Sequence, residues 1–229
     1  MAPHTSLTRR GFFGAASSAA AAALAAPRSA FAAPDAKVPQ PIAALNDLSG
    51  QARPFTVDER LARIERAKKL MHAARMDAIV LANSTASSFY FAGLRFYSSE
   101  RLWALVLPAH AAPFLVCPAF EEGRARELIA AGPLAAHADV LTWQEDESPY
   151  ELIGKGLADR GMKTATIGMD EEMKFVFSDG IRAANPHLAF VSATPVTAGC
   201  RMIKDAHELD CMRLACRATL LVYRAVAQS

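Results

Sequence analysis

Apolar residues in the middle of the chain alternate between short continuous runs and stretches of helical spacing. The short runs predict buried strands at 78–81, 103–107, 114–117, 140–143, 165–169 and 188–192. Helices are predicted at 87–92, 120–131, 149–160 and 175–184, each before a glycine or proline. A few residues around Pro108 join the second and third strands, which favours an antiparallel hairpin. We therefore expect an α/β fold with a mixed β-sheet flanked by helices.

A further helix is predicted at the start of this region. Thr56 and Glu59 have the spacing of a capping box, in which each side chain accepts a hydrogen bond from a free backbone amide. The apolar positions that follow at helical spacing are Val57, Leu61, Ile64, Ala67, Met71 and Ala74. The opposite face is basic, with Arg60, Arg63, Lys68 and Lys69. We interpret this basic face as solvated.

The last segment predicts a long amphipathic helix. Asp205 and Glu208 again have capping-box spacing. The apolar stripe continues through Leu209, Met212, Cys216, Leu220 and Tyr223. Such a helix needs a surface to pack against. It either docks on the preceding α/β unit or opens a second domain.

The first residues are typical of a targeting signal. Arg9 and Arg10 precede an Ala-rich apolar run at 15–26 and a small-x-small cleavage pattern at 30–32. This order predicts a twin-arginine signal over 1–32, and the run is short for a membrane anchor. A tether with four prolines follows at 33–54. We therefore expect the twin-arginine export machinery as a partner and a periplasmic or secreted mature protein.

Composition narrows the class of protein. The chain has 229 residues, 52% of them hydrophobic, and 25 basic against 23 acidic side chains, which indicates a globular protein. Loss of Arg9, Arg10 and Arg28 with the signal leaves 22 basic residues against the same 23 acidic ones. This balance, without a basic stripe interleaved with aromatic residues, argues against a nucleic-acid partner.

The sequence offers one set of residues for a metal site. Cys200, His207, Cys211 and Cys216 are zinc-ligand types, but Cys211 and Cys216 lie about 140° apart around their helix. They cannot converge on one ion, so we assign no metal ligands in this chain and interpret these cysteines as buried thiols at a helix interface. The roles of the four cysteines, Cys117 included, remain open. No glycine-rich phosphate loop or Gly-x-Ser-x-Gly elbow occurs.

Three segments together resemble the amino-terminal domain of the creatinase/prolidase ("pita-bread") metallopeptidase family. They are Phe-Tyr-Phe-Ala-Gly-Leu at 89–94, Ser-Ser-Glu-Arg-Leu-Trp-Ala-Leu-Val-Leu-Pro at 98–108, and Ala-Gly-Cys-Arg-Met-Ile-Lys-Asp-Ala-His-Glu-Leu at 198–209. The third is the most specific, because it fixes a basic pair and a helix cap at set spacing. The likeness is greatest to Xaa-Pro aminopeptidases and Xaa-Pro dipeptidases and runs from about residue 55 to residue 229.

The resemblance implies an amino-terminal α/β domain at 55–197 and, at 198–229, the junction and first helix of a catalytic domain that this chain lacks. In the family that domain holds two divalent metal ions with two Asp, one His and two Glu. The chain alone would thus have no catalytic residue and no cofactor. We expect this chain to be the module of an exported Xaa-Pro-specific metallopeptidase that mediates oligomerisation and closes over the substrate. The enzyme would be a homodimer, and its substrates would be short proline-containing peptides. The alternative is a stand-alone exported binding or partner domain without hydrolytic activity.

One substrate-binding residue is implied by the same resemblance. Arg101 occupies the position where some family members present an arginine to the substrate of the partner subunit, that is, in trans. A guanidinium can bind a peptide carboxylate with two hydrogen bonds. The alternative for Arg101 is an ordinary surface ion pair with Glu100 or another acid. The sequence leaves both open.

Overall fold

The computed structural model describes residues 38–97 and 100–229. The predicted signal with Arg9 and Arg10, the first residues of the predicted tether, and Ser98 and Ser99 lie outside the described residues. The chain divides into two compact units. The larger is Leu48–Cys216, and the smaller contains, of the described residues, 38–47 and 217–229. The short helix α2 (Gln40–Ala43) belongs to the smaller unit.

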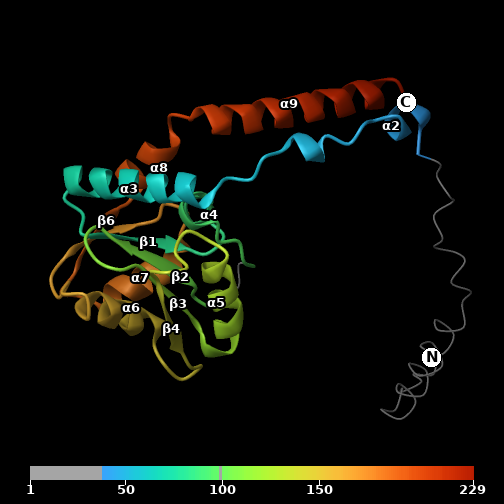
Figure 1. Cartoon of the computed structure of the whole chain (residues 1–229). Coiled ribbons are helices and arrows are strands. Elements are labelled where there is room, and N and C mark those ends of the chain that lie inside the picture. Colours follow the sequence, from blue (N-terminus) through green and yellow to red (C-terminus); the bar gives the residue numbers. More distant parts are fainter. Residues whose placement is uncertain (1–37, 98–99) are drawn as a thin grey trace, which may run out of the picture. The chain divides into compact units, whose positions relative to one another are not determined.

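The centre of the larger unit is a mixed sheet, which in the described part of the chain has six strands in the order β4-β3-β2-β1-β5-β6 (Figure 1). The strands are β1 (Ala78–Ala82), β2 (Ala104–Pro108), β3 (Phe114–Pro118), β4 (Asp139–Trp143), β5 (Thr166–Met169) and β6 (Ala189–Ser192). Their bounds lie within one residue of those predicted, so the strand predictions are confirmed. β1, β2 and β3 pair antiparallel, which confirms the hairpin, and the other neighbours pair parallel.

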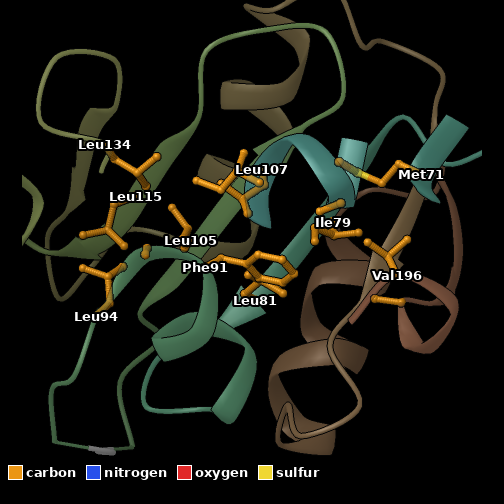
Figure 2. Packing of buried hydrophobic residues seen from close by; sticks show 14 of the residues in the cluster. Met71, Ile79, Leu81, Phe91, Leu94, Leu105, Leu107, Leu115, Leu134 and Val196 are labelled. Carbon is orange, nitrogen blue, oxygen red and sulfur yellow. The ribbon is translucent and has the colours of Figure 1, made fainter. Parts of the chain in front are cut away.

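Helices cover both faces of this sheet. They are α3 (Val57–Ala73), α4 (Ala86–Ala92), α5 (Glu122–Ala130), α6 (Pro149–Ala158), α7 (Phe175–Ala184) and α8 (Thr194–Arg201), with the 3-10 turns η2 (Ser49–Gln51) and η3 (Ala119–Glu121). Side chains of α3, α4, α5 and α8 pack on one face, and side chains of α6 and α7 on the other. Figure 2 shows the first of these two cores, which contains Phe91 of α4 and Leu81 of β1.

The two capping boxes predicted from the sequence are confirmed. At the start of α3, the backbone amide of Thr56 donates to Glu59 Oε2 at 2.6 Å, and the amide of Glu59 donates to Thr56 Oγ1 at 3.2 Å. At the start of α9 (Ala206–Ala227), the amide of Asp205 donates to Glu208 at 2.9 Å, and the amide of Glu208 donates to Asp205 at 2.8 Å. Local hydrogen bonding therefore fixes where both helices begin.

The structure corrects the helix predictions in two places. Helix α8 was not predicted, because its sequence Thr-Pro-Val-Thr-Ala-Gly-Cys-Arg is rich in β-branched residues and has a proline near its start. On α3, Val57 and Leu61 are exposed, whereas Arg63, which was assigned to the solvated face, is buried. No helix in the described ranges is long and apolar enough to cross a membrane.

Candidate functional site

A groove of about 550 Å³ lies in the larger unit where α3, α4, the turn after α4 and the start of α9 come together. Its walls are largely apolar, but four basic side chains and one acidic side chain also line it. These are Arg63, Arg95, Arg201, Lys204 and Glu208. The volume is in the usual range of ligand sites, about 300–1,000 Å³. This groove is the candidate functional site.

Arg63 of α3 is the central side chain of the groove. Its guanidinium lies between the rings of Phe55 and Tyr90, at 4.1 and 4.2 Å from their centroids. It donates to the Tyr90 carbonyl at 3.2 Å and to Glu208 Oε1 at 3.3 Å. Only 6% of the Arg63 side chain and 12% of the Glu208 side chain are exposed, so this ion pair is buried. Since Glu208 also caps α9, the pair holds the start of α9 to α3 and α4.

The turn after α4 depends on a glycine. Gly93 ends α4 in the left-handed region, with φ of 72°. Arg60 lies against this turn and donates to the carbonyls of Phe89 and Tyr90, at 3.2 Å for the second. A cation at the last carbonyls of a helix is favoured by the helix dipole. Burial lowers the pKa of Arg60 below its ordinary value.

A second link joins α3 and α9. His207 Nδ1 lies 2.7 Å from Glu59 Oε1, and its Nε2 lies 3.0 Å from the carbonyl of Arg53. The His207 ring also contacts Phe55, with 4.4 Å between the ring centroids. The hydrogen bond from the Thr56 amide, followed by the one from His207, lowers the pKa of Glu59 to about 2. Glu59 therefore stays ionised throughout the neutral range.

Further hydrogen bonds fix the floor of the groove. The Tyr90 hydroxyl donates to the carbonyl of Cys200 in α8 at 3.0 Å, and burial raises the pKa of Tyr90 above its ordinary value. Tyr90 is thus a neutral hydrogen-bond donor at pH 7. At the ends of β1 and β5, Thr85 donates to the buried Asp170 at 2.7 Å, and burial raises the pKa of Asp170. These bonds hold α4 against the sheet and α8.

Arg101, the predicted substrate-binding residue, lies outside this groove. Its Nε and Nη2 donate to the two carboxylate oxygens of Glu145, at 2.7 and 3.2 Å, and it also pairs with Glu100. The hydrogen bond to Glu145 raises the pKa of Arg101, and the same bond lowers the pKa of Glu145. The ion pair weighed in the sequence analysis is therefore present within the chain. The role of Arg101 in trans stays a prediction.

The family of the chain follows from comparison with known proteins. Residues 63–203 match the Creatinase/Prolidase N-terminal domain. The chain belongs to this family. The resemblance stated from three short segments is thereby confirmed, and so is the expected α/β fold. The matched region of this creatinase/prolidase domain begins at Arg63 and contains Arg95, Arg101 and Arg201.

Two curated relatives of this chain are named as dipeptidases. PepE of Mycobacterium tuberculosis is 31% identical over 140 residues, which make up 61% of this chain and 35% of that protein. YkvY of Bacillus subtilis is 27% identical over 156 residues, or 68% of this chain and 41% of that protein. The chain therefore spans about two fifths of the length of these relatives or less.

Two solved structures resemble the creatinase/prolidase domain. Dipeptidase PepE from Mycobacterium ulcerans has 25% identity and a TM-score of 0.59, with 69% of this chain and 40% of that chain covered. The N-terminal domain of Xaa-Pro dipeptidase from Lactobacillus brevis has 16% identity and a TM-score of 0.52, with 62% and 99% covered. The second likeness shows the fold alone, and it spans nearly all of that separate domain.

The cysteines of the creatinase/prolidase domain differ in their surroundings. Cys117 in β3 and Cys200 in α8 are buried, and burial raises their pKa values to about 12 and about 11. Cys211 is partly exposed and Cys216 is exposed, so the interpretation of Cys216 as a buried thiol was wrong. In residues 38–97 and 100–229, no three His, Cys, Asp or Glu side chains are grouped so that they could hold a metal ion.

Sequence reasoning missed the residues that build the groove. Arg63 was grouped with the basic face of α3, although it lies four residues before Ala67 and eight before Met71, both fully buried. This spacing places Arg63 on the buried face of the helix. The sequence analysis did not identify Phe55 and Tyr90 as the aromatic partners of the Arg63 guanidinium. A buried arginine needs such partners, and these could have been sought.

Proposed function

We propose that this chain is the amino-terminal module of an exported Xaa-Pro-specific metallopeptidase, which forms dimers and closes over short proline-containing peptides. Membership of the creatinase/prolidase family supports this proposal, as do the names of the relatives. Catalysis would belong to a further domain, which would supply two divalent metal ions. The stand-alone binding or partner domain remains the alternative, and the assays below separate the two.

The observation that carries the proposal is the state of α9. The first turns of this helix are held to the α/β unit by the Arg63–Glu208 and His207–Glu59 contacts. Its apolar side chains Leu209 and Leu220, which lie outside the groove, are nevertheless 39% and 56% exposed. An anchored helix with an uncovered apolar face offers a surface on which another domain can pack. In the proposed enzyme, the catalytic domain covers this face.

The chain alone is proposed to be catalytically incompetent. Amide hydrolysis by paired metals needs both a metal-bound water and a Lewis acid, and the family holds its metals with ligands outside this domain. We expect purified 33–229 to retain no stoichiometric zinc, manganese or cobalt after dialysis and to release no proline from Xaa-Pro dipeptides. Near-stoichiometric metal with chelator-sensitive hydrolysis would overturn the proposal. Tight binding of the same dipeptides by the chain alone would favour the stand-alone binding domain.

Export is proposed to depend on Arg9 and Arg10. Their replacement by Lys keeps the charge but removes the guanidinium pair, and the two side chains are not interchangeable in recognition. We expect the precursor to accumulate in the cytoplasm, as measured by cell fractionation. Arg28→Lys is the control, because it makes the same exchange at a single arginine outside the pair, nearer the predicted cleavage site. Normal export of the double Lys variant would refute the pathway.

Arg101 is proposed to reach the active site of the partner subunit in the assembled enzyme. A mixed dimer can test this, with Arg101→Ala in one subunit and one metal ligand removed from the other. If Arg101 acts in trans, the metal-competent site receives its arginine from the other subunit and part of the activity returns. If it acts in cis, each site carries one lesion and no activity returns. Unchanged hydrolysis by the Arg101→Ala homodimer would dismiss the residue.

A further inference from the structure

The groove between α3, α4 and the start of α9 carries an excess of positive charge. Of its basic residues, Arg63 pairs with Glu208 at 3.3 Å and Arg201 pairs more loosely with Glu172 at 3.7 Å. Arg95 and Lys204 also line the groove, and neither has an ion pair with a carboxylate in the described ranges. Among the residues that the structure describes, Lys204 donates only to the backbone carbonyl of Arg201. Two exposed cations are therefore available to an anion.

The rest of the groove wall is apolar and aromatic. Phe55, Phe89 and Tyr90 line it, together with Leu94 and Met212. The Arg95 guanidinium lies over the Phe89 ring, 4.7 Å from its centroid. This contact holds a flexible cation at the edge of an apolar surface. A ligand with both a negative charge and an apolar body fits such a wall better than a bare inorganic ion does.

One buried donor in the groove lacks an acceptor. Arg63 Nε is buried and has no hydrogen-bond partner within residues 38–97 and 100–229. Buried polar groups in native proteins nearly always have a partner, so an exception asks for an explanation. The other guanidinium nitrogens of Arg63 are engaged by Glu208 and by the Tyr90 carbonyl. The wall of the groove therefore contains one polar group whose hydrogen bonding the described residues do not satisfy.

We propose that this groove is a binding site for a small organic anion, a carboxylate joined to an apolar or aromatic body. Arg95 and Lys204 bind the carboxylate, and the aromatic wall contacts the body. The cavity volume of about 550 Å³ suits a molecule of this size rather than a folded partner. The site is built from one chain and is separate from Arg101, so it does not rest on the proposed peptidase function.

The test uses three probes and calorimetric titration of the chain. N-acetyl-L-phenylalanine carries the carboxylate and the aromatic body, its amide lacks the charge, and inorganic phosphate lacks the body. We expect saturable one-to-one binding of the acid, with binding of the amide and of phosphate at least about tenfold weaker, since hydrogen bonds to charged groups are the stronger ones. Equal affinity for acid and amide would overturn the proposal, as would no saturation by the acid.

Two variants identify the site, and a third serves as a control. Arg95→Gln and Lys204→Gln remove exposed side chains, so the fold should persist, and each should weaken binding of the acid about tenfold. Arg124→Gln removes the same charge from an exposed pair on α5 and should leave the affinity unchanged. An equal loss in all three variants would show a general charge effect and refute the site. Unchanged affinity in Arg95→Gln and Lys204→Gln would refute it as well.

Discussion

The buried pair of Arg63 and Glu208 allows a quantitative test of how α9 is held. In Arg63→Met the side chain keeps a similar length but loses its charge. The variant loses the hydrogen bonds to Glu208 and to the Tyr90 carbonyl, together with both ring contacts. It also leaves the Glu208 carboxylate, only 12% exposed, without its cation. The perturbation therefore combines lost attraction with an unpaired buried charge.

The magnitude follows from these contacts. Removal of one partner of a buried ion pair costs about 3–5 kcal/mol. The Nε of Arg63 is already without an acceptor, so its removal recovers on the order of 1 kcal/mol. We expect Arg63→Met to lower the free energy of unfolding by about 3 kcal/mol. With a urea dependence of about 2 kcal/mol per molar, the unfolding midpoint should fall by roughly 1.5 M.

A double-mutant cycle separates the pair from the ring contacts. Glu208→Gln keeps an acceptor for the Asp205 amide, so the helix cap survives while the charge is lost. The coupling between Arg63→Met and Glu208→Gln should reach about 1–3 kcal/mol. The exposed pair of Arg124 and Glu127 on α5 is the reference, with an expected coupling of at most about 0.5 kcal/mol. The reasoning fails if the two couplings are equal, or if Arg63→Met costs less than about 1 kcal/mol.

Three more predictions concern single residues. In native protein at pH 8 a thiol reagent should label Cys216 quickly, and Cys117 and Cys200 only after unfolding, because burial raises the pKa values of the latter two to about 12 and about 11. The pKa of Glu59 falls from 4.5 to about 2 on folding, so its contribution to stability should be present above pH 4.5 and be lost toward pH 2. In Glu59→Gln this part of the acid dependence of the urea midpoint should vanish. Gly93→Ala should destabilise the chain by about 1–2 kcal/mol, because φ is 72° and the new Cβ would lie 3.2 Å from Arg60 Cζ. An unchanged melting temperature of Gly93→Ala would contradict this prediction.

The sequence predicted the sheet well because its signals are local. Each strand is a short apolar run bounded by turn residues, and the buried strands β1, β2 and β3 read as continuous apolar segments. The capping boxes at Thr56 and Asp205 are equally local, since each needs only residues three positions apart. Gly93 is also a local signal: the sequence predicts that a helix ends at this glycine, and in the structure Gly93 is the residue that ends α4. Such features depend on residues close in sequence and not on contacts with distant segments.

The groove could not be predicted because its contacts join distant segments. Arg63 and Glu208 are 145 residues apart, and His207 and Glu59 are 148 apart. The pattern within α3 gives the face on which Arg63 lies, but not the aromatic rings and the carboxylate that make its burial possible. Helix α8 shows the same limit, because packing of Val196 and Cys200 on the sheet outweighs a weak local preference for helix. Tertiary contacts decide these cases.

Arg101 offers a last prediction, which tests its role through its partner. Within the chain, the Glu145 carboxylate takes both hydrogen bonds that a peptide carboxylate would need, at 2.7 and 3.2 Å. If Arg101 has the proposed role, a substrate would have to replace the Glu145 carboxylate with its own, which gains little direct energy and adds the cost of releasing Glu145. In the proposed full-length enzyme, Glu145→Gln should remove this competing carboxylate and lower KM several-fold, while Arg101→Gln should raise it. Glu127→Gln, at an exposed position of α5, is the charge-matched control. If Glu145→Gln instead raises KM as Arg101→Gln does, the pair acts as a structural unit and Arg101 does not bind the substrate.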